Sequence, residues 1–265
     1  MSAGTGQNAE TALGPPRPPP GPGAPRGEGA GAPLATDRGV LLTAKDAARL
    51  LKAAEEDIYR WVEAGEIPFV QVNDQPRFNQ AELLEWATAR HREVSVDMFT
   101  EGGTAGLGLE EALRAGGVHS GVRGADRQSA LAEVMARMNV PDEDRETLLE
   151  IMLAREDLGS TAIGGGVAIP HVRHPAVVPG VRPSITLCYL ETPLDLAAPD
   201  GQPVHTLFAI LSTTVRGHLQ LLAKLSSALH DEGFKSAVAS RAGADQIFQH
   251  AARLDAAFAR SKRPH

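Results

Sequence analysis

The chain has 265 residues, of which 42% are hydrophobic and 22% charged, and its formal net charge is −7. This length suits one or two domains with a core of ordinary size, and the acidic balance argues against a generally basic protein that coats nucleic acid. The apolar runs are too short to span a bilayer and the N-terminus lacks the pattern of an export signal, so we expect a cytoplasmic protein without a membrane partner.

Residues 1–38 are dominated by glycine, proline and alanine, as in PPRPPPGPGAPRGEGAGAP. A segment with so few large apolar side chains cannot offset the conformational entropy lost on folding, so we predict a disordered tail. Its PRPPP stretch could instead serve as a docking ligand in a polyproline II conformation.

Residues 39–92 predict a compact module of helix, turn, helix, hairpin and helix. Thr43 is a suitable N-cap for a first helix, and a second apolar stripe ends at Gly65. Alternating residues at 69–72 and a return at 77–78 flank a predicted turn at 73–76, and a last helix is expected over 80–90. This order is that of a winged helix-turn-helix, in which we expect Trp61 and Trp86 to be core residues.

Residues 93–106 end in Gly-Gly-Thr-Ala-Gly and are predicted to be a linker to a larger domain at 107–262. The two apolar runs SITLCYL and VHTLFAIL are typical of strands that helices cover on both faces. The pattern therefore predicts an α/β layer structure. Its expected elements are strands at 118–122, 184–190 and 204–211, and helices at 109–115, 127–138, 142–154, 217–229 and 243–258.

The segment REDLGSTAIGGGVAIPHVRH, from Arg155 to His174, gathers the groups that bind phosphate. His171 follows a buried-looking VAIP run, and histidine is a nucleophile at neutral pH. Arg155 offers a fork of donors, and Ser160 and Thr161 offer hydroxyls for phosphoryl oxygens or the His171 ring. Gly164, Gly165 and Gly166 would let the backbone approach closely. Arg155 could instead pair with Glu156, Asp157 or Asp195 on the surface, and Ser160 and Thr161 could merely cap or turn the chain.

The stretch LAREDLGSTAIGGGVAIPH and the later VHTLFAILSTTVRGHLQLLAKLS resemble the enzyme IIA domains of the bacterial phosphotransferase system, of the fructose, mannitol and nitrogen-regulatory type. The resemblance implies helices flanking a mixed sheet, with His171 as the phosphorylated residue, His218 as its partner and Arg155 as the phosphate-stabilising arginine. It also implies an HPr-like donor protein, an enzyme IIB or a regulated protein as acceptor, and no metal or other cofactor. The family often has a small residue after the active histidine, where this chain has Val172-Arg173-His174-Pro175, which bears on partner specificity.

Other chemistries fit the residues less well. His171, His174, His205 and His218 lack the close ligand spacing and interleaved carboxylates of a zinc site, and Cys188 is the single cysteine, which excludes a disulfide. Cys188 itself lies in an apolar run and is expected to be a buried core thiol and not a phosphoryl acceptor. Gly159-Ser160-Thr161 is not the G-x-S-x-G elbow of a serine hydrolase.

The stretch LLTAKDAARLLKAAEEDIYRWVEAGEIPFVQVNDQPRFNQAELLEWA resembles the excisionase and MerR-like helix-turn-helix domains. The resemblance implies a second helix that enters the major groove, with Tyr59, Arg60 and Arg77 as possible DNA contacts. Charge favours a different partner. Residues 40–92 hold seven basic and nine acidic residues, a net charge of −2, and the acidic run 55–57 lies where the second helix would begin and would repel phosphates. A module that binds protein is thus an open alternative.

Three hypotheses follow. The first is a phosphocarrier or regulator of the phosphoenolpyruvate-dependent phosphotransferase system, in which His171 accepts a phosphoryl group and passes it on or signals with it. The second is a transcriptional regulator that binds DNA through residues 39–92, with the C-terminal domain as a phosphorylation sensor. The third is a protein-interaction module without catalysis.

Overall fold

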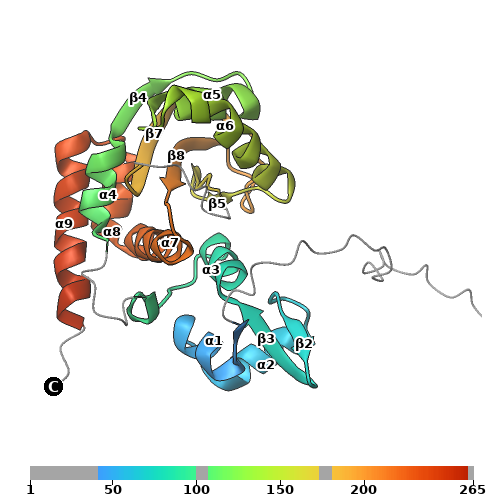
Figure 1. The fold of residues 1–265 in the computed structure, drawn as a ribbon. Coiled ribbons are helices and arrows are strands. Elements are labelled where there is room, and N and C mark those ends of the chain that lie inside the picture. The colour runs from blue at the N-terminus through green and yellow to red at the C-terminus, as the bar shows by residue number, and fades with distance from the viewer. Residues whose placement is uncertain (1–40, 100–106, 173–180, 262–265) are drawn as a thin grey trace, which may run out of the picture. The chain divides into compact units, whose positions relative to one another are not determined.

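A computed structural model describes residues 41–99, 107–172 and 181–261 (Figure 1). The predicted tail at 1–38, the glycine-rich end of the linker and residues 173–175 lie outside the described residues. We call residues 41–92 the N-terminal module and the described residues from 107 onward the α/β domain. The described residues all belong to one compact unit.

The N-terminal module contains three short strands and three helices. Its elements are β1 (Leu41–Leu42), α1 (Ala44–Leu50), α2 (Glu55–Glu63), β2 (Val70–Val72), β3 (Gln75–Asn79) and α3 (Gln80–Ala89). The strands form an antiparallel sheet in the order β1-β3-β2. The predicted helices and hairpin are present, and β1, which has two residues, was not foreseen.

Local side-chain chemistry fixes the ends of these elements. Thr43 caps α1, and its hydroxyl accepts from the backbone N–H of Asp46 at 3.2 Å. The hairpin turns at Asn73 and Asp74, whose φ angles of 50° and 57° match a two-residue turn, so β3 starts at Gln75, inside the turn predicted at 73–76. Asn79 caps α3 through bonds from the N–H groups of Ala81 and Glu82, which sets the direction of that helix.

The α/β domain consists of a five-stranded mixed sheet flanked by helices, which confirms the predicted fold class. Its elements are α4 (Leu109–Gly116), β4 (Val118–Val122), α5 (Arg127–Arg137), α6 (Asp142–Asp157), β5 (Ala162–Gly164), β6 (Val167–Ala168), β7 (Ser184–Leu194), β8 (Val204–Leu211), α7 (Val215–His230), α8 (Glu232–Ala239) and α9 (Ala244–Ser261). The strand order is β4-β7-β8-β6-β5, in which β4 pairs parallel to β7, and β6 parallel to β8, while β7 and β8 are antiparallel. The strands β5 and β6 and the helix α8 were not predicted.

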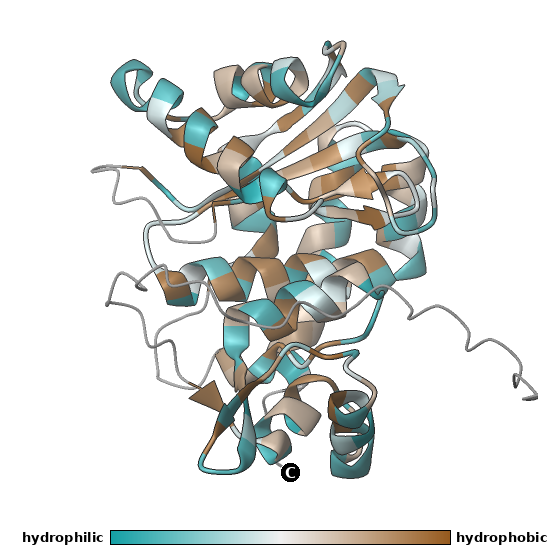
Figure 2. Ribbon diagram, turned by 90° about the vertical axis from the view of Figure 1, so that its right-hand side faces the viewer, coloured by the Kyte–Doolittle hydropathy of each residue, from teal (hydrophilic) through white to brown (hydrophobic). Residues whose placement is uncertain are grey.

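Two hydrophobic cores lie on opposite faces of the sheet. Along β7, Leu187 and Tyr189 face the core that contains α4, α7, α8 and α9, whereas Cys188 and Leu190 face the core that contains α5 and α6. This alternation explains why the run is apolar at successive positions. Figure 2 shows the hydrophobic residues along these strands. Burial raises the pKa of the Cys188 thiol to about 12.

The N-terminal module shares the first of these cores with the α/β domain. Helix α3 packs against α7 and β5, and the linker residues Val94, Val96 and Phe99 are buried, with Asp97–Phe99 forming a short 3-10 helix, η1. The side chain of His230 in α7 also bonds the carbonyl oxygen of His91 at 2.7 Å. The first half of the predicted linker therefore packs between the two parts. No helix within the described ranges is both long and apolar enough to cross a membrane.

Gly116, the last residue of α4, gives a stability prediction. A Cβ at this position would lie 2.3 Å from the carbonyl oxygen of Ile185 in β7, which is backbone and cannot rotate away. We expect Gly116→Ala to lower the free energy of unfolding by about 1–3 kcal/mol, as overpacking does in other cores. Urea denaturation measures this. The control is Gly243→Ala, whose Cβ meets no described atom within 4 Å, and equal stability of the two variants would contradict the close packing of α4 on β7.

Candidate functional site

The backbone of β8 holds His171 in place. The chain leaves β6 and continues along β8, where the N–H of Ile210 donates to the carbonyl oxygen of Pro170 at 3.1 Å. The ring Nδ1 of His171 lies 2.7 Å from the carbonyl oxygen of Ile169. Because a carbonyl oxygen can only accept, Nδ1 carries the hydrogen, and in the neutral ring Nε2 is the nitrogen with a lone pair. Nε2 is therefore the ring nitrogen that could act as a nucleophile.

His218 lies beside His171 in the first turn of α7. Thr214 caps this helix by accepting from the N–H of Gly217 at 3.0 Å, and the centroids of the two imidazole rings lie 5.0 Å apart. Burial and the neighbouring His171 lower the pKa of His218 to about 3, against an opposing effect of Glu85. The ring is therefore neutral at physiological pH. Its Nε2 is buried and forms no hydrogen bond with the described residues.

The lowered pKa of His218 predicts a loss of stability in acid. The unfolded chain binds a proton at this residue below its ordinary value of 6.5, whereas the folded protein does so only near pH 3. Stability present above pH 6.5 is thus lost as the pH falls toward 3, by up to about 1.4 kcal/mol per pH unit. Urea denaturation between pH 7 and pH 4 should show a shallower decline for His218→Gln than for the wild type. Parallel declines in the two proteins would show that His218 is not the residue responsible.

Arg155, in the last turn of α6, completes a cluster with the two histidines. Its Nη1 donates to the carbonyl oxygen of Gly159 at 2.9 Å, and its Nη2 donates to Oε2 of Glu85 at 2.8 Å. Its Nε is buried and makes no hydrogen bond among the described residues. The structure thus brings His171, His218 and Arg155 together around buried N–H groups that can hold an anion.

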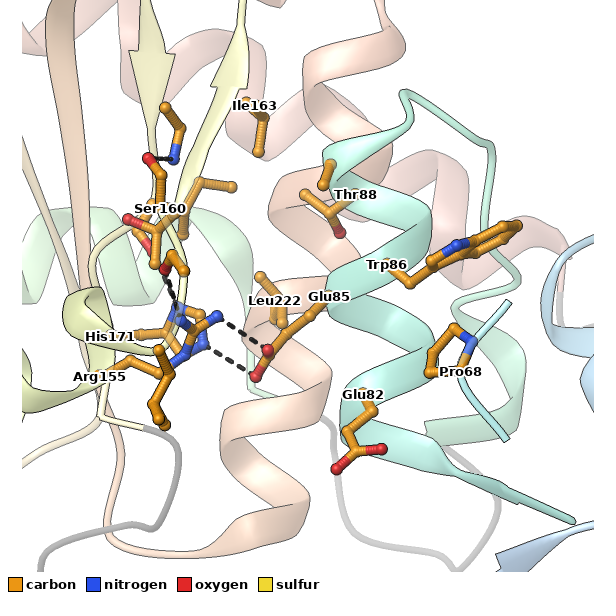
Figure 3. A pocket seen from close by; sticks show the side chains of 16 residues that line it. Pro68, Glu82, Glu85, Trp86, Thr88, Arg155, Ser160, Ile163, His171 and Leu222 are labelled. Atoms are coloured by element: carbon orange, nitrogen blue, oxygen red, sulfur yellow. Dashed lines mark hydrogen bonds and ion pairs between the residues drawn. The ribbon is translucent and has the colours of Figure 1, made fainter. Parts of the chain in front are cut away.

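Glu85, from α3 of the N-terminal module, is the residue that sequence reasoning missed. One carboxylate oxygen binds Arg155 and the other, Oε1, lies 3.2 Å from Nε2 of His171 (Figure 3). The side chains of Arg155 and Glu85 are 10% and 11% exposed, so the ion pair is largely shielded from water. His171 is 3% exposed. Glu85 and its helix α3 therefore cover the ring in this structure.

A cavity of about 520 Å³ lies between α3 and the α/β domain at this point. Glu82, Glu85 and Trp86 line it from α3, and Arg155 and His171 line it from the opposite side (Figure 3). Most of its other lining residues come from α3 and the Leu158–Ile163 segment. The candidate site is therefore at the junction of the two parts of the chain.

The hydroxyl groups of Ser160 and Thr161 have protein partners here. Ser160 Oγ donates to the carbonyl oxygen of Leu196, and Thr161 Oγ1 donates to the buried carboxylate of Glu156. Both residues line the cavity, but these hydrogen bonds hold the loop that follows α6. Their predicted contact with phosphoryl oxygens stays a prediction. The alternative partners considered for Arg155 are also engaged elsewhere, since Asp157 pairs with Arg127.

The glycine run forms the turn between β5 and β6. Gly164, Gly165 and Gly166 have φ angles of +91°, +60° and +72°, which favour glycine at all three positions. The N–H of Gly165 donates to Asp200 at 2.7 Å and lowers the pKa of that carboxyl group. Gly164 and Gly165 line a second cavity and not the one that contains His171. The structure therefore places these glycines in a turn, and it does not bring Gly164 and Gly165 to the cavity of His171, where we predicted that they would contact phosphate.

Of the predicted nucleic-acid residues, Tyr59 and Arg60 are exposed on the N-terminal module and Arg77 is half-buried. Tyr59 is 45% exposed, and the Arg60 side chain is 70% exposed and pairs with Asp57 within α2. Arg77, in β3, bonds the side chain of Gln75 at 2.8 Å. Trp61 is buried and Trp86 is partly buried, with ring centroids 5.6 Å apart. The two tryptophans pack together within the module.

His205, another of the histidines weighed as metal ligands, does not join this cluster. His205 lies at the second cavity and its Nδ1 contacts Thr206 Oγ1 at 2.8 Å, while His174 is outside the described residues. Within the described ranges, no three His, Cys, Asp or Glu side chains gather as metal ligands would.

Comparison with known proteins matches each part of the chain separately. The family model described as "Phosphoenolpyruvate-dependent sugar phosphotransferase system, EIIA 2" matches residues 112–252, and a "Helix-turn-helix domain" model matches residues 41–91. The two matches cover the α/β domain almost completely and the N-terminal module.

Individual relatives agree with the first match. The "Nitrogen regulatory protein" of Pseudomonas aeruginosa is 32% identical over 146 residues, which are 53% of this chain and 92% of that protein. The protein of the same name from Bradyrhizobium diazoefficiens is 32% identical over 127 residues, covering 46% of this chain and 80% of that protein. Among solved structures, Nitrogen Regulatory Protein IIA-Ntr from Neisseria meningitidis is 26% identical with a TM-score of 0.46, and covers 54% of this chain and 98% of that one.

Proposed function

Because the chain belongs to the EIIA 2 family of the phosphoenolpyruvate-dependent sugar phosphotransferase system and also contains a helix-turn-helix domain, we propose that it is a phosphocarrier that accepts a phosphoryl group on His171. The donor would be a phosphohistidine on an HPr-like carrier protein. The observation that carries this proposal is the cluster itself, in which Arg155 and the neutral His218 lie beside His171 and each has a buried nitrogen without a hydrogen bond among the described residues.

The transfer needs little covalent chemistry from the protein. Nε2 of His171 attacks the phosphorus in line, and the bond between phosphorus and the donor's ring nitrogen breaks, leaving its electron pair on the donor imidazole. His171 keeps the hydrogen on Nδ1 throughout, held by the carbonyl oxygen of Ile169. Arg155 stabilises the equatorial phosphoryl oxygens, and His218 Nε2 donates a hydrogen bond when it carries the ring hydrogen. Ser160 and Thr161 would assist only if their present bonds exchange.

The phosphoryl group would then pass to an enzyme IIB or alter a regulated protein. The similarity to proteins named nitrogen regulatory protein supports a regulatory use of the phosphorylated state. The N-terminal module, attached to the same chain, supports it further, because it gives the phosphorylated domain a second surface through which to act.

The proposal is tested by incubating the full chain with phosphorylated HPr prepared with labelled phosphate. We expect a label that is lost in acid, survives in base and maps by mass spectrometry to the peptide that contains His171. This stability pattern distinguishes a phosphohistidine from a phosphoserine or phosphothreonine. A chain that takes up no label, or takes up an acid-stable one, is not a phosphocarrier of this kind.

DNA binding through residues 39–92 is a second candidate function. It is favoured by the exposure of Tyr59 and Arg60 on α2 in a module that matches a helix-turn-helix model. Binding to duplex DNA should weaken steeply as salt rises, and should be lost in Arg60→Ala and in Arg77→Ala. Arg123→Ala, which removes an exposed arginine from the α/β domain, is the matched control. Binding that survives both module substitutions would favour a protein partner for this module.

A further inference from the structure

Glu85 occupies the position at which a phosphoryl group on His171 would lie. We propose that this carboxylate is a built-in competitor for the phosphoryl site, so that phosphorylation of His171 and docking of α3 exclude one another and phosphorylation releases the N-terminal module from the α/β domain. This inference rests on the proposed function, whose acceptor atom it shares. It adds a regulatory contact within the chain that family membership of the α/β domain does not supply.

The geometry indicates that Glu85 and a phosphoryl group on His171 cannot occupy the site at the same time. Glu85 binds with both oxygens, Oε2 to Arg155 Nη2 at 2.8 Å and Oε1 to His171 Nε2 at 3.2 Å. A phosphorus atom bonded to Nε2 would lie closer to that nitrogen than Oε1 does, and its oxygens would extend into the space of the carboxylate. The carboxylate thus occupies the Arg155 donor and covers the nitrogen that a phosphoryl group needs.

Charge makes the exclusion stronger. The phosphoryl group adds between one and two negative charges, and Glu85 would face them in a place that is 11% exposed and so poorly screened by water. Like charges at this distance in a largely dry site repel each other strongly. When Glu85 leaves, Arg155 pairs with the phosphoryl group in place of the carboxylate. The arginine therefore keeps an anionic partner, and the carboxylate of Glu85 becomes hydrated.

The N-terminal module has internal packing of its own, in addition to the core that it shares with the α/β domain. Leu50, Ile58 and Phe78 are fully buried, and Trp86 of α3 donates to the carbonyl oxygen of Glu66 within the same module at 2.6 Å. Glu85 makes the ion pair with Arg155 and the contact with His171 that link α3 to the residues of the site. Loss of the Glu85 contacts therefore weakens docking and leaves the module's internal packing intact.

The same contact controls access of the donor. His171 is 3% exposed while α3 is docked, so a phosphorylated carrier protein can reach it only in the undocked fraction of molecules. The apparent rate of phosphorylation is then reduced by that fraction. On undocking, the carboxylate of Glu85 moves away from His171, and Nε2 is then free to attack.

The first experiment measures the rate at which phosphorylated HPr labels the full-length protein and two variants. Glu85→Ala should be labelled about tenfold faster than the wild type, which corresponds to a docked fraction of about nine in ten. Glu82→Ala removes the same charge from the same helix and the same cavity, one turn earlier (Figure 3). It should be labelled at the wild-type rate. Equal rates for the wild type and Glu85→Ala overturn the proposed competition.

The second experiment follows docking directly, by electron spin resonance distances between nitroxides at Glu63→Cys on α2 and Glu150→Cys on α6. Both positions are exposed, and Cys188 is buried and stays unlabelled. Phosphorylation should convert one narrow distance distribution into a broad, longer one in the wild-type background and in Glu82→Ala. In Glu85→Ala the distribution should already be broad before phosphorylation, because α3 is no longer held, and phosphorylation should not change it further. A wild-type distribution that stays narrow after complete phosphorylation overturns the inference and leaves the proposed function intact.

A third arm needs no phosphoryl donor. His171→Glu places a carboxylate against Glu85, whereas His171→Gln has nearly the same shape without the charge. The distance distribution should broaden in the glutamate variant and stay narrow in the glutamine variant, with circular dichroism confirming that both are folded. Identical distributions in the two variants overturn the inference, whether or not the protein accepts a phosphoryl group. A protein that is not labelled by phosphorylated HPr counts against the proposed function alone.

Discussion

Replacing His171 with asparagine should reduce phosphoryl acceptance from phosphorylated HPr by at least about a thousandfold, the scale seen when an enzyme loses its nucleophile. The asparagine amide can donate to the carbonyl oxygen of Ile169 as ring Nδ1 does at 2.7 Å, so the local backbone keeps its anchor. It has no nitrogen lone pair comparable to Nε2. The loss should therefore be chemical, and the melting temperature should change little.

The matched control is His205→Asn. His205 is the histidine on β8, partly buried, and its Nδ1 contacts Thr206 at the second cavity. Its label should equal that of the wild type in both amount and acid lability. If His205→Asn lost the label and His171→Asn kept it, the acceptor would be His205, and the cluster around Arg155 would have another purpose.

The long elements of the fold could be predicted because their patterns are local. The apolar runs that became β7 and β8 identify buried strands, and the stripes of α5, α6 and α9 identify helices. The strands β5 and β6 were missed because they have three and two residues and surround a glycine turn. Helix α8 has eight residues and an internal glycine, Gly233, and it begins at an Asp231 cap directly after α7 ends. Patterns this short carry little periodicity.

The residues of the site also differ in how far the sequence could predict them. Sequence resemblance placed His171, His218 and Arg155 in one site. In the structure, His171 and Arg155 line the same cavity, and the ring of His218 lies beside that of His171. The resemblance concerned the α/β domain alone, so it held no information about Glu85, which is separated from His171 by 86 positions in the chain. Glu85 counted in the sequence only as one of nine acids in a module with a net charge of −2. Its significance comes from the packing of α3 on α7.

Arg155 should show two opposing effects, because it binds both Glu85 and, by our proposal, the phosphoryl group. Arg155→Lys keeps the charge but loses the fork that reaches Gly159 and Glu85 together. Weaker docking of α3 would raise access to His171, while loss of a donor to the transferring group lowers the rate by about 100-fold or more. In the single variant we therefore expect a net loss smaller than the full catalytic effect.

A double-mutant cycle with Glu85→Ala separates the two effects. In the Glu85→Ala background the competitor is absent, so Arg155→Lys should reduce the labelling rate by its full amount, about 100-fold relative to Glu85→Ala alone. If Arg155 merely anchored Glu85, the double variant would instead be labelled as fast as Glu85→Ala. The coupling energy between the two positions measures how strongly Arg155 acts through its contact with Glu85. It is obtained from the labelling rates of four proteins: the wild type, the two single variants and the double variant.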